Sequence, residues 1–450
     1  MAVNGMMLGN PSLFAKKEVK IGDDMILPIP KYGARIIRKI VKRDVDTAMP
    51  VLPGNPLIRW KVPSNSSSIY DFRRAKILIS ITVTSSSGTP APSALAWNII
   101  DRFRLEQGGQ YIEDRRFFNL QETLTYVVQT HQKQQETTGV GLYGDGSLAL
   151  RQGQAVDYMY CLPLPTTGLV KATYPWYQTT KTAQGIISST MLPDTYLQWE
   201  LARPESFVEV VGGVAPYTVS YSINRMQIEY EELYSDSGNN AALIANWLQM
   251  ENSVTKGYPN IWYRTFQSNN YPITTALEQT LFIDVRLSSI ISIYVTFRRI
   301  ADVNDTTVLN KHQLWLGPTI LNIIEYQWEV NSCLWPDKPV SLNDPGKVEA
   351  YAYFLESWQM FHSRGISQEC TPISKNEFIT DKFVLAFDGN TQPFTSLVIN
   401  PLSTALTNSQ IQLKMKFNPA PPAGVEAMVH VYHWRKWNFG SKGQVPCVET

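Results

Sequence analysis

Two stretches of this chain, about 224 positions apart, read as copies of each other. The first begins Asn98-Ile99-Ile100-Asp101 and the second Asn322-Ile323-Ile324-Glu325, so that 322 − 98 = 224. After each stretch comes a segment with helical spacing of apolar residues, which opens at Asn119 in the first copy and at Asp344 in the second. A period this long is far longer than one solenoid unit, so it predicts two similar domains in tandem.

Alternation of apolar and polar residues with period two is the second repeated feature. It predicts antiparallel strands with one buried face and one wet face. The segments that show it, in matching pairs, are 77–83 with 291–297 and 197–201 with 411–417. A proline-containing connection and one more long strand, at 217–230 or 425–434, end each half. Both halves therefore close with the same order of strands.

Clusters of Gly, Pro, Ser and Asn separate the expected strands, as in residues 85–90. Many short strands with frequent turn signals indicate a sandwich or a barrel rather than alternating strands and helices. We predict an N-terminal arm at 1–50, a first domain at 51–235, a connecting helix and linker at 236–256, and a second domain at 257–450.

Composition excludes several classes of protein. The net charge of +1 gives no bulk signal for binding nucleic acid or an anionic membrane. The four cysteines (Cys161, Cys333, Cys370 and Cys447) lack paired spacing, which is typical of a reduced, intracellular origin. We identify no signal peptide and no run of the ~20 apolar residues that span a bilayer. These features predict a soluble chain made in the cytoplasm.

The first 50 residues differ in charge from the rest of the chain. They hold nine Lys/Arg and five Asp/Glu (9 − 5 = +4), whereas the remainder holds 31 and 34 (31 − 34 = −3). The basic residues that we single out are Lys31, Arg35, Arg38, Lys39, Lys42 and Arg43. Such a segment either contacts something acidic, such as nucleic acid, a membrane surface or a neighbouring subunit, or lies solvated on its own domain.

Some residue patterns resemble binding motifs, but the residues around them do not predict the local structure that these motifs need. Residues 139–144 match the letters of a dinucleotide-binding fingerprint, which needs a strand before it and a helix after it. The flanking residues here are polar or turn-forming. His430 and His433 lie three apart on an expected strand and therefore face opposite sides, so they do not share a zinc ion. The sequence predicts no enzyme, no catalytic residue, no cofactor and no metal site.

One part of the repeat supports a resemblance to a known family. In 98–112 a strand leads through the turn Gln107-Gly108-Gly109-Gln110 into Tyr111-Ile112, and 217–230 reads as the strand that closes the first domain. The corresponding turn of the second copy, Val330-Asn331-Ser332-Cys333, lacks glycines. With the basic arm, this pattern over most of residues 50–440 resembles the double jelly-roll major capsid proteins of icosahedral DNA viruses. The resemblance implies an all-β fold of two tandem eight-stranded jelly rolls with short inserted helices.

The resemblance also implies a function and partners. Members of the family form homotrimers, pseudo-hexagonal capsomers that tile an icosahedral virion shell beside other capsid, vertex or cement proteins. The basic arm would then face the shell interior and contact a membrane, the genome or a neighbouring trimer. The aromatic residues that we expect at subunit interfaces are Trp176, Tyr177, Trp262, Tyr263, Trp434 and Trp437. The expected location is the virion, after synthesis in the host cytoplasm.

Two other functions stay open at this point. One is a jelly-roll carbohydrate-active enzyme similar to a peptide-glycan amidase, which would need converging carboxyl groups across a cleft. The other is a lectin-like protein that presents aromatic residues to a glycan. A capsid protein should be a stable trimer or a larger particle, whereas a glycan enzyme is usually monomeric.

Overall fold

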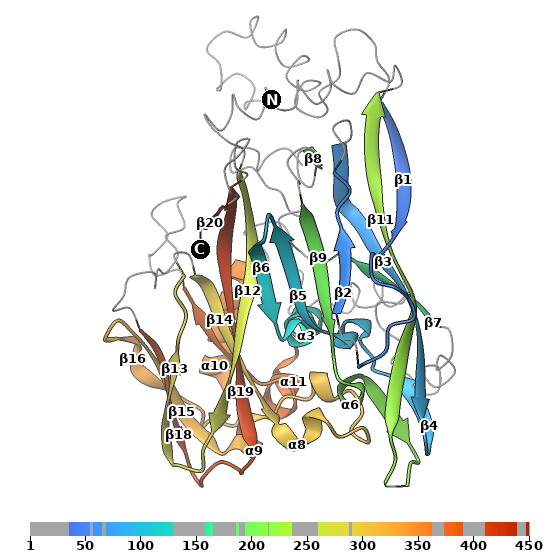
Figure 1. The fold of residues 1–450 in the computed structure, drawn as a ribbon. Coiled ribbons are helices and arrows are strands. Elements are labelled where there is room, and N and C mark those ends of the chain that lie inside the picture. The colour runs from blue at the N-terminus through green and yellow to red at the C-terminus, as the bar shows by residue number, and fades with distance from the viewer. Residues whose placement is uncertain are drawn as a thin grey trace, which may run out of the picture.

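Strands dominate the fold and form two side-by-side groups, residues 36–235 and 260–449 (Figure 1). The computed structural model describes residues 36–54, 57–64, 69–128, 158–164, 186–188, 194–214, 216–235, 260–287, 290–361, 373–389, 410–438 and 447–449. We call the two groups roll 1 and roll 2. The connecting helix expected within 236–256 lies outside the described residues.

Roll 1 consists of two facing sheets. Their strands are β1 (Ile36–Asp44), β2 (Leu57–Lys61), β3 (Ile69–Ser85), β5 (Ile100–Gln107), β6 (Gln110–Arg116), β7 (Tyr158–Pro163), β9 (Thr195–Leu201) and β11 (Val219–Ser235). The first sheet has the order β1-β11-β3-β7 and the second the order β2-β9-β5-β6. Shorter strands lie beside them: β8 (Ile186–Ser188) pairs with β3, and β10 (Val208–Val211) pairs with β4 (Thr89–Pro92).

Roll 2 repeats this arrangement. Its strands are β12 (Asn260–Ile273), β13 (Glu278–Ile283), β14 (Ile290–Arg299), β15 (Ile323–Val330), β16 (Cys333–Ser341), β17 (Val384–Asp388), β18 (Ile411–Phe417) and β19 (Val425–Asn438). The sheet orders are β12-β19-β14-β17 and β13-β18-β15-β16, and β20 (Cys447–Glu449) pairs with β19. When the short strands β4, β8, β10 and β20 are left out, both rolls join strands first-eighth-third-sixth and second-seventh-fourth-fifth. This is one jelly-roll topology used twice, and it confirms the all-β, double jelly-roll prediction.

The offset between the two copies differs by one residue between the sequence repeat and the strand pairing. Ile100 pairs with Leu201 at the end of β9, and Ile323 pairs with Phe417 at the end of β18. The structural offset is therefore 323 − 100 = 223, against 224 for the letters. A register irregularity follows immediately in each strand, between Ile100 and Arg102 and between Ile323 and Glu325. Both copies therefore share the same local irregularity, a form of β-bulge.

The turn that lacks glycines is nevertheless equivalent in the two rolls. Gly108 and Gly109 have φ of 57° and 79°, and Asn331 and Ser332 have φ of 51° and 65°. Positive φ at both central residues is what the commonest tight hairpin turn requires, and asparagine tolerates it better than most residues. The β5–β6 and β15–β16 hairpins therefore match, although only one has the expected glycines.

Helices occupy the connections between strands. The two helices expected after the repeated strands are α3 (Phe118–Val127) and α10 (Val348–Phe361), which confirms both. The short elements are η1 (Ala96–Ile99), α6 (Pro204–Phe207), α8 (Ile300–Val303), η4 (Lys311–Gln313), α9 (Pro318–Leu321) and α11 (Lys375–Thr380). Ser374 and Glu377 form a capping box that fixes the start of α11.

The structure corrects the boundary between arm and first roll. The sequence placed this boundary at residue 50, but β1 is a strand of the first sheet and pairs with β11 from Ile36↔Ser235 to Asp44↔Gln227. Without β1, the two main sheet paths of roll 1 would have seven described strands instead of the eight in those of roll 2. Most residues of β1 are exposed because it lies at the edge of the sheet, and this is why its basic residues read as a free arm.

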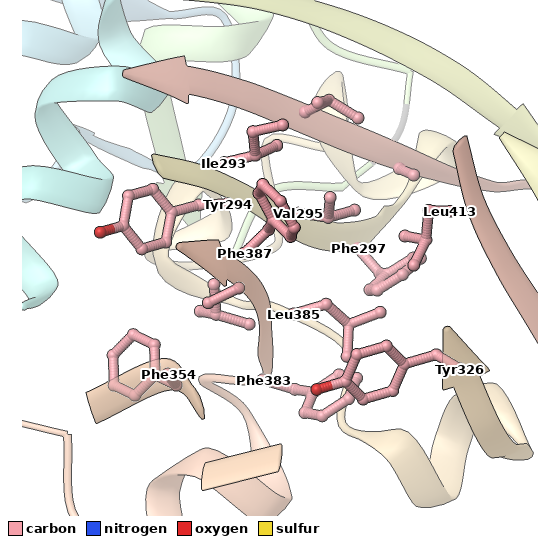
Figure 2. Packing of buried hydrophobic residues seen from close by; sticks show 14 of the residues in the cluster. Ile293, Tyr294, Val295, Phe297, Tyr326, Phe354, Phe383, Leu385, Phe387 and Leu413 are labelled. Carbon is pink, nitrogen blue, oxygen red and sulfur yellow. The ribbon is translucent and has the colours of Figure 1, made fainter. Parts of the chain in front are cut away.

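Each roll has its own apolar core between its two sheets. The core of roll 2 is rich in aromatic residues (Figure 2). The labelled side chains come from β14 (Ile293, Tyr294, Val295, Phe297), from β17 and the residue before it (Phe383, Leu385, Phe387), from α10 (Phe354), from β15 (Tyr326) and from β18 (Leu413). Tyr294 also donates a hydrogen bond of 3.1 Å to the carbonyl oxygen of Ser357. The helix α10 thus closes one side of this core.

Gly317 gives a first prediction, because α11 lies against it. A Cβ at this position would overlap the backbone oxygens of Ile379 and Thr380 at the end of α11. We expect Gly317→Ala to destabilise the protein by about 1–3 kcal/mol, the usual cost of overpacking. Gly54→Ala is the control, since no atom lies within 4 Å of its added Cβ. Equal denaturation midpoints for the two variants would contradict this packing.

Candidate assembly surfaces and the junction between the rolls

The basic residues expected in an arm lie mainly on β1. Arg38, Lys39, Lys42 and Arg43 are exposed there, whereas Lys31 and Arg35 lie outside the described residues. Arg38 pairs with Glu231 at 3.5 Å and Lys42 with Glu229 at 3.4 Å, both across the β1–β11 ladder. Exposed pairs of this kind contribute little to stability. Over residues 36–44, the basic segment therefore lies on its own domain.

The candidate interface aromatics whose side chains the structure describes are buried or half-buried. Tyr263 and Trp437 are 1 % and 0 % exposed, so the expectation that they contact other subunits is wrong. Trp434 is half-buried, with the Arg264 guanidinium 4.5 Å from its ring centroid. Trp262 belongs to β12, where it is opposite Lys436, and its side chain is not among those described. Trp176 and Tyr177 lie outside the described residues.

Tyr263 and Trp437 are buried because they cross from roll 2 into the core of roll 1. In return, α3 of roll 1 places Leu124 and Val127, with Val128 just after the helix, in the core of roll 2. Each roll thus supplies apolar side chains to the other. The two rolls share one continuous apolar junction, which favours a fixed relative orientation.

Hydrogen bonds between buried groups accompany this exchange. The Thr265 hydroxyl of β12 donates to the Glu113 carboxylate of β6 at 2.5 Å. The Trp437 indole donates to Gln107 Oε1 at 3.1 Å. The Gln121 amide of α3 donates to Ser268 Oγ at 2.8 Å, and Ser268 in turn lies 2.8 Å from His430 Nδ1. These bonds satisfy polar groups that would otherwise be costly to bury.

A second set of contacts joins loops of the two rolls. His312 of η4 donates through Nε2 to the carbonyl oxygen of Ser206 in α6 at 3.0 Å. The backbone N–H of Asn310 donates to Glu209 Oε1 at 2.9 Å. Lys311 donates to the carbonyl oxygen of Glu205, and burial lowers the pKa of Lys311 to about 8. The junction therefore extends to the loops between β9 and β11 and between β14 and β15.

Burial shifts the pKa values of the titratable groups of the junction and keeps its histidines neutral at neutral pH. Desolvation lowers the pKa of His312 and of His430 to about 3 and that of His433 to about 4. Burial also raises the pKa of Glu113, against the opposing pull of Arg115. His430 and His433 bond to different partners, Ser268 and the carbonyl oxygen of Trp434. These shifts follow from desolvation and make the junction sensitive to acid.

Two of the exposed aromatic residues that the sequence analysis missed lie on strands. Phe282 of β13 is 58 % exposed and Tyr111 of β6 is 52 % exposed. The period-two pattern could have found Phe282, because its neighbours Leu281 and Ile283 are both buried and it must then point to the wet face. Across the part of the chain that the structure describes, no cluster of three or more metal-binding side chains occurs. No described helix is long and apolar enough to cross a bilayer.

Comparison with known proteins gives matches in structure alone. No protein-family model matches the sequence, and no curated protein matches it. VP54 of the virus PBCV-1 superposes with a TM-score of 0.55 at 10 % identity over 94 % of this chain and 98 % of that one. The Faustovirus major capsid protein gives 0.54 at 9 % identity, over 95 % and 96 %. A PBCV-1 capsid structure gives 0.53 at 10 % identity, over 94 % and 98 %.

This chain has the double jelly-roll fold of these viral capsid proteins. The matches cover both rolls and the junction between them, since the aligned part is more than nine-tenths of every chain. At identities of 9–10 % the likeness establishes the fold alone. The particular contacts of this chain must therefore be argued from its own side chains.

Proposed function

We propose that this chain is a major capsid protein, the structural subunit of an icosahedral virus shell. The observation that carries the proposal is the repetition of one jelly-roll topology in two rolls that share a buried junction. A PBCV-1 capsid structure and the Faustovirus major capsid protein share this architecture over almost their whole length. A structural subunit needs a rigid body with extensive outer surfaces and no catalytic centre.

Three copies would associate into a trimer, because two similar rolls per chain then give six similar units around a ring with a nearly hexagonal outline. Such trimers would tile a shell beside neighbouring trimers and vertex or cement proteins. The chain would be made in the host cytoplasm and reside in the virion. Lys31 and Arg35, which precede β1, would contact a membrane, the genome or a neighbouring trimer, together with the exposed basic residues of β1, Arg38, Lys39, Lys42 and Arg43.

The molecular mass in solution tests this proposal. Light scattering on the purified full-length protein should give three copies of the 51.0 kDa chain, or a multiple of that mass. Incubation with bacterial peptidoglycan should release no soluble fragments. A monomer at all concentrations would contradict the capsid proposal, and a monomer that also releases fragments would favour the carbohydrate-active alternative.

A further inference from the structure

The outer face of one sheet of roll 2 carries exposed apolar residues at both of its margins. The sheet has the order β13-β18-β15-β16, and Figure 1 shows it on the side of roll 2 that is farther from roll 1. At one margin Phe282 of β13 is 58 % exposed, and at the other Leu334 of β16 is 46 % exposed. Exposed apolar groups that border a polar surface are typical of protein–protein contact sites.

Phe282 and Leu334 belong to one row of side chains across this face. The strand pairing places Phe282 opposite Gln412, Gln412 opposite Glu329, and Glu329 opposite Leu334. Residues directly opposite each other on neighbouring strands share a face of the sheet. Neighbouring strands lie ~4.8 Å apart, so the steps from β13 to β16 separate Phe282 from Leu334 by ~14 Å within one chain. The two apolar residues therefore lie at the same height on opposite margins.

Between the margins, the face carries two cations on β18 and two carboxylates on β15. Lys414 pairs with Glu329 at 2.5 Å, and Lys416 pairs with Glu325 at 3.5 Å. The side chains of Lys416 and Glu325 are 46 % and 36 % exposed, so both charges remain accessible to a partner. The middle of the face thus consists of a cationic strand beside an anionic strand.

The equivalent face of roll 1 has a different residue at one margin. Its matching row consists of Lys61, Tyr196, Glu106 and Tyr111. Lys61 therefore occupies the position that Phe282 has in roll 2, and it forms an ion pair with Asp194 at 3.1 Å. An apolar residue at each end of the row is a property of roll 2 alone.

The face of roll 2 is complementary to itself under a two-fold rotation about an axis parallel to its strands. With the axis between β18 and β15, the rotation places β18 of one copy over β15 of the other, and β13 over β16. Lys416 then faces Glu325 of the second copy, and Phe282 faces Leu334 of the second copy. Such a contact is isologous, because both copies use the same patch. Since the axis runs along the strands, both copies keep the same end of the molecule on the same side, as neighbours in a shell must.

We propose that the outer face of the β13-β18-β15-β16 sheet docks on the same face of a second copy in a neighbouring trimer, about a two-fold axis. This inference rests on the proposed function and adds the contact that joins trimers, since a three-fold contact alone produces separate trimers. The two pairs of Phe282 with Leu334 supply apolar burial. The central charges fix how the two faces align.

Disulfide formation between cysteines at positions 282 and 334 tests the contact. The variant carries Phe282→Cys and Leu334→Cys, with Cys333→Ser to remove the exposed native thiol beside them. A disulfide needs Cα atoms within about 7 Å, so the ~14 Å between the two positions in one chain allows the bond only between copies. We expect covalent dimers on a non-reducing gel, at least tenfold more than Cys333→Ser alone gives. No larger product should rise above that background, because each pair of copies closes both bonds between them.

Glu278→Cys, combined with Leu334→Cys and Cys333→Ser, is the matched control. Glu278 is exposed on the same strand and the same face as Phe282. It lies four residues from Phe282, or ~13 Å along the strand, and is therefore too far from position 334 of the second copy. This variant should give no dimer above the level of Cys333→Ser alone.

Phe282→Asp gives a second measurement that needs no cysteine. Sedimentation at rising protein concentration reports how much protein associates beyond the trimer. We expect the variant to need at least tenfold more protein than the wild type to reach the same fraction of larger particles. The trimer itself should be unchanged, because Phe282 is exposed and lies outside the core. Equal association of the two proteins would overturn the inference.

The outcomes separate this inference from the proposed function. If the mass in solution is that of a trimer or a multiple of it, but positions 282 and 334 give no more dimer than positions 278 and 334, the docking face is wrong while the capsid proposal stands. Covalent products larger than a dimer would also overturn the inference, because they require a head-to-tail contact. If the protein is a monomer at all concentrations and gives no covalent dimer, both proposals fail together.

Discussion

Replacement of Trp437 by alanine is expected to destabilise the protein by about 3–5 kcal/mol, the usual cost of removing a large aromatic side chain from a core. Trp437 belongs to β19 of roll 2, yet it is fully buried in the core of roll 1 and donates a hydrogen bond to Gln107. The loss should therefore lower the denaturation midpoint of roll 1 as well as that of roll 2. Chemical denaturation followed by tryptophan fluorescence measures the loss.

Trp434→Ala is the matched control, three residues earlier on the same strand. Its ring is half-buried and packs against the core of roll 2, so the expected loss is smaller and confined to that roll. A fall in stability for Trp437→Ala no larger than for Trp434→Ala would contradict the exchange of side chains between the rolls.

Acidification from about pH 7 to about pH 5 is expected to destabilise the junction more than any single core substitution. The folded-state pKa values of His312, His430 and His433 are about 3, 3 and 4, while an unfolded histidine titrates near ~6.5. Below ~6.5 the unfolded chain binds protons that the folded chain does not. The free energy of unfolding then falls by up to about 1.4 kcal/mol per pH unit for each histidine.

Glu113 acts in the opposite direction, because its folded-state pKa is raised by burial. Its ionised form costs stability at neutral pH, and that cost disappears as pH falls through its folded-state pKa. Three histidines outweigh this single carboxyl group above about pH 4. The net expectation is therefore acid lability between about pH 6.5 and pH 4.

His312→Gln isolates one histidine, because the glutamine amide keeps a donor for the carbonyl oxygen of Ser206. Below about pH 6.5, the free energy of unfolding of the variant should fall less steeply with decreasing pH than that of the wild type. The difference in slope should be up to about 1.4 kcal/mol per pH unit. Urea denaturation at about pH 7 and pH 5, at one protein concentration, measures the difference from wild type. Parallel pH profiles for the two proteins would contradict the neutral, buried state of His312.

Sequence patterning predicted the architecture well, because strand alternation and the two repeated helices are local features. The sequence prediction was wrong where contacts between distant parts of the chain determine whether a residue is paired or buried. The basic residues of β1 looked like an arm, since nothing local shows that Asp44 and Ile36 pair with β11. Tyr263 and Trp437 were expected at interfaces between subunits, whereas they lie at the interface between the two rolls of one chain, in the core of roll 1.

The exposure of Ile40 and Leu334 could not be predicted from the sequence either. It depends on β1 and β16 lying at the edges of their sheets, which only the strand order shows. Only the exposed position of Phe282 was available from alternation alone.

Electron cryo-microscopy of the purified protein in solution tests the central claim most directly. The account predicts a three-fold ring of six similar double-sheet densities. A lone pair of rolls, or a two-fold dimer, would contradict it.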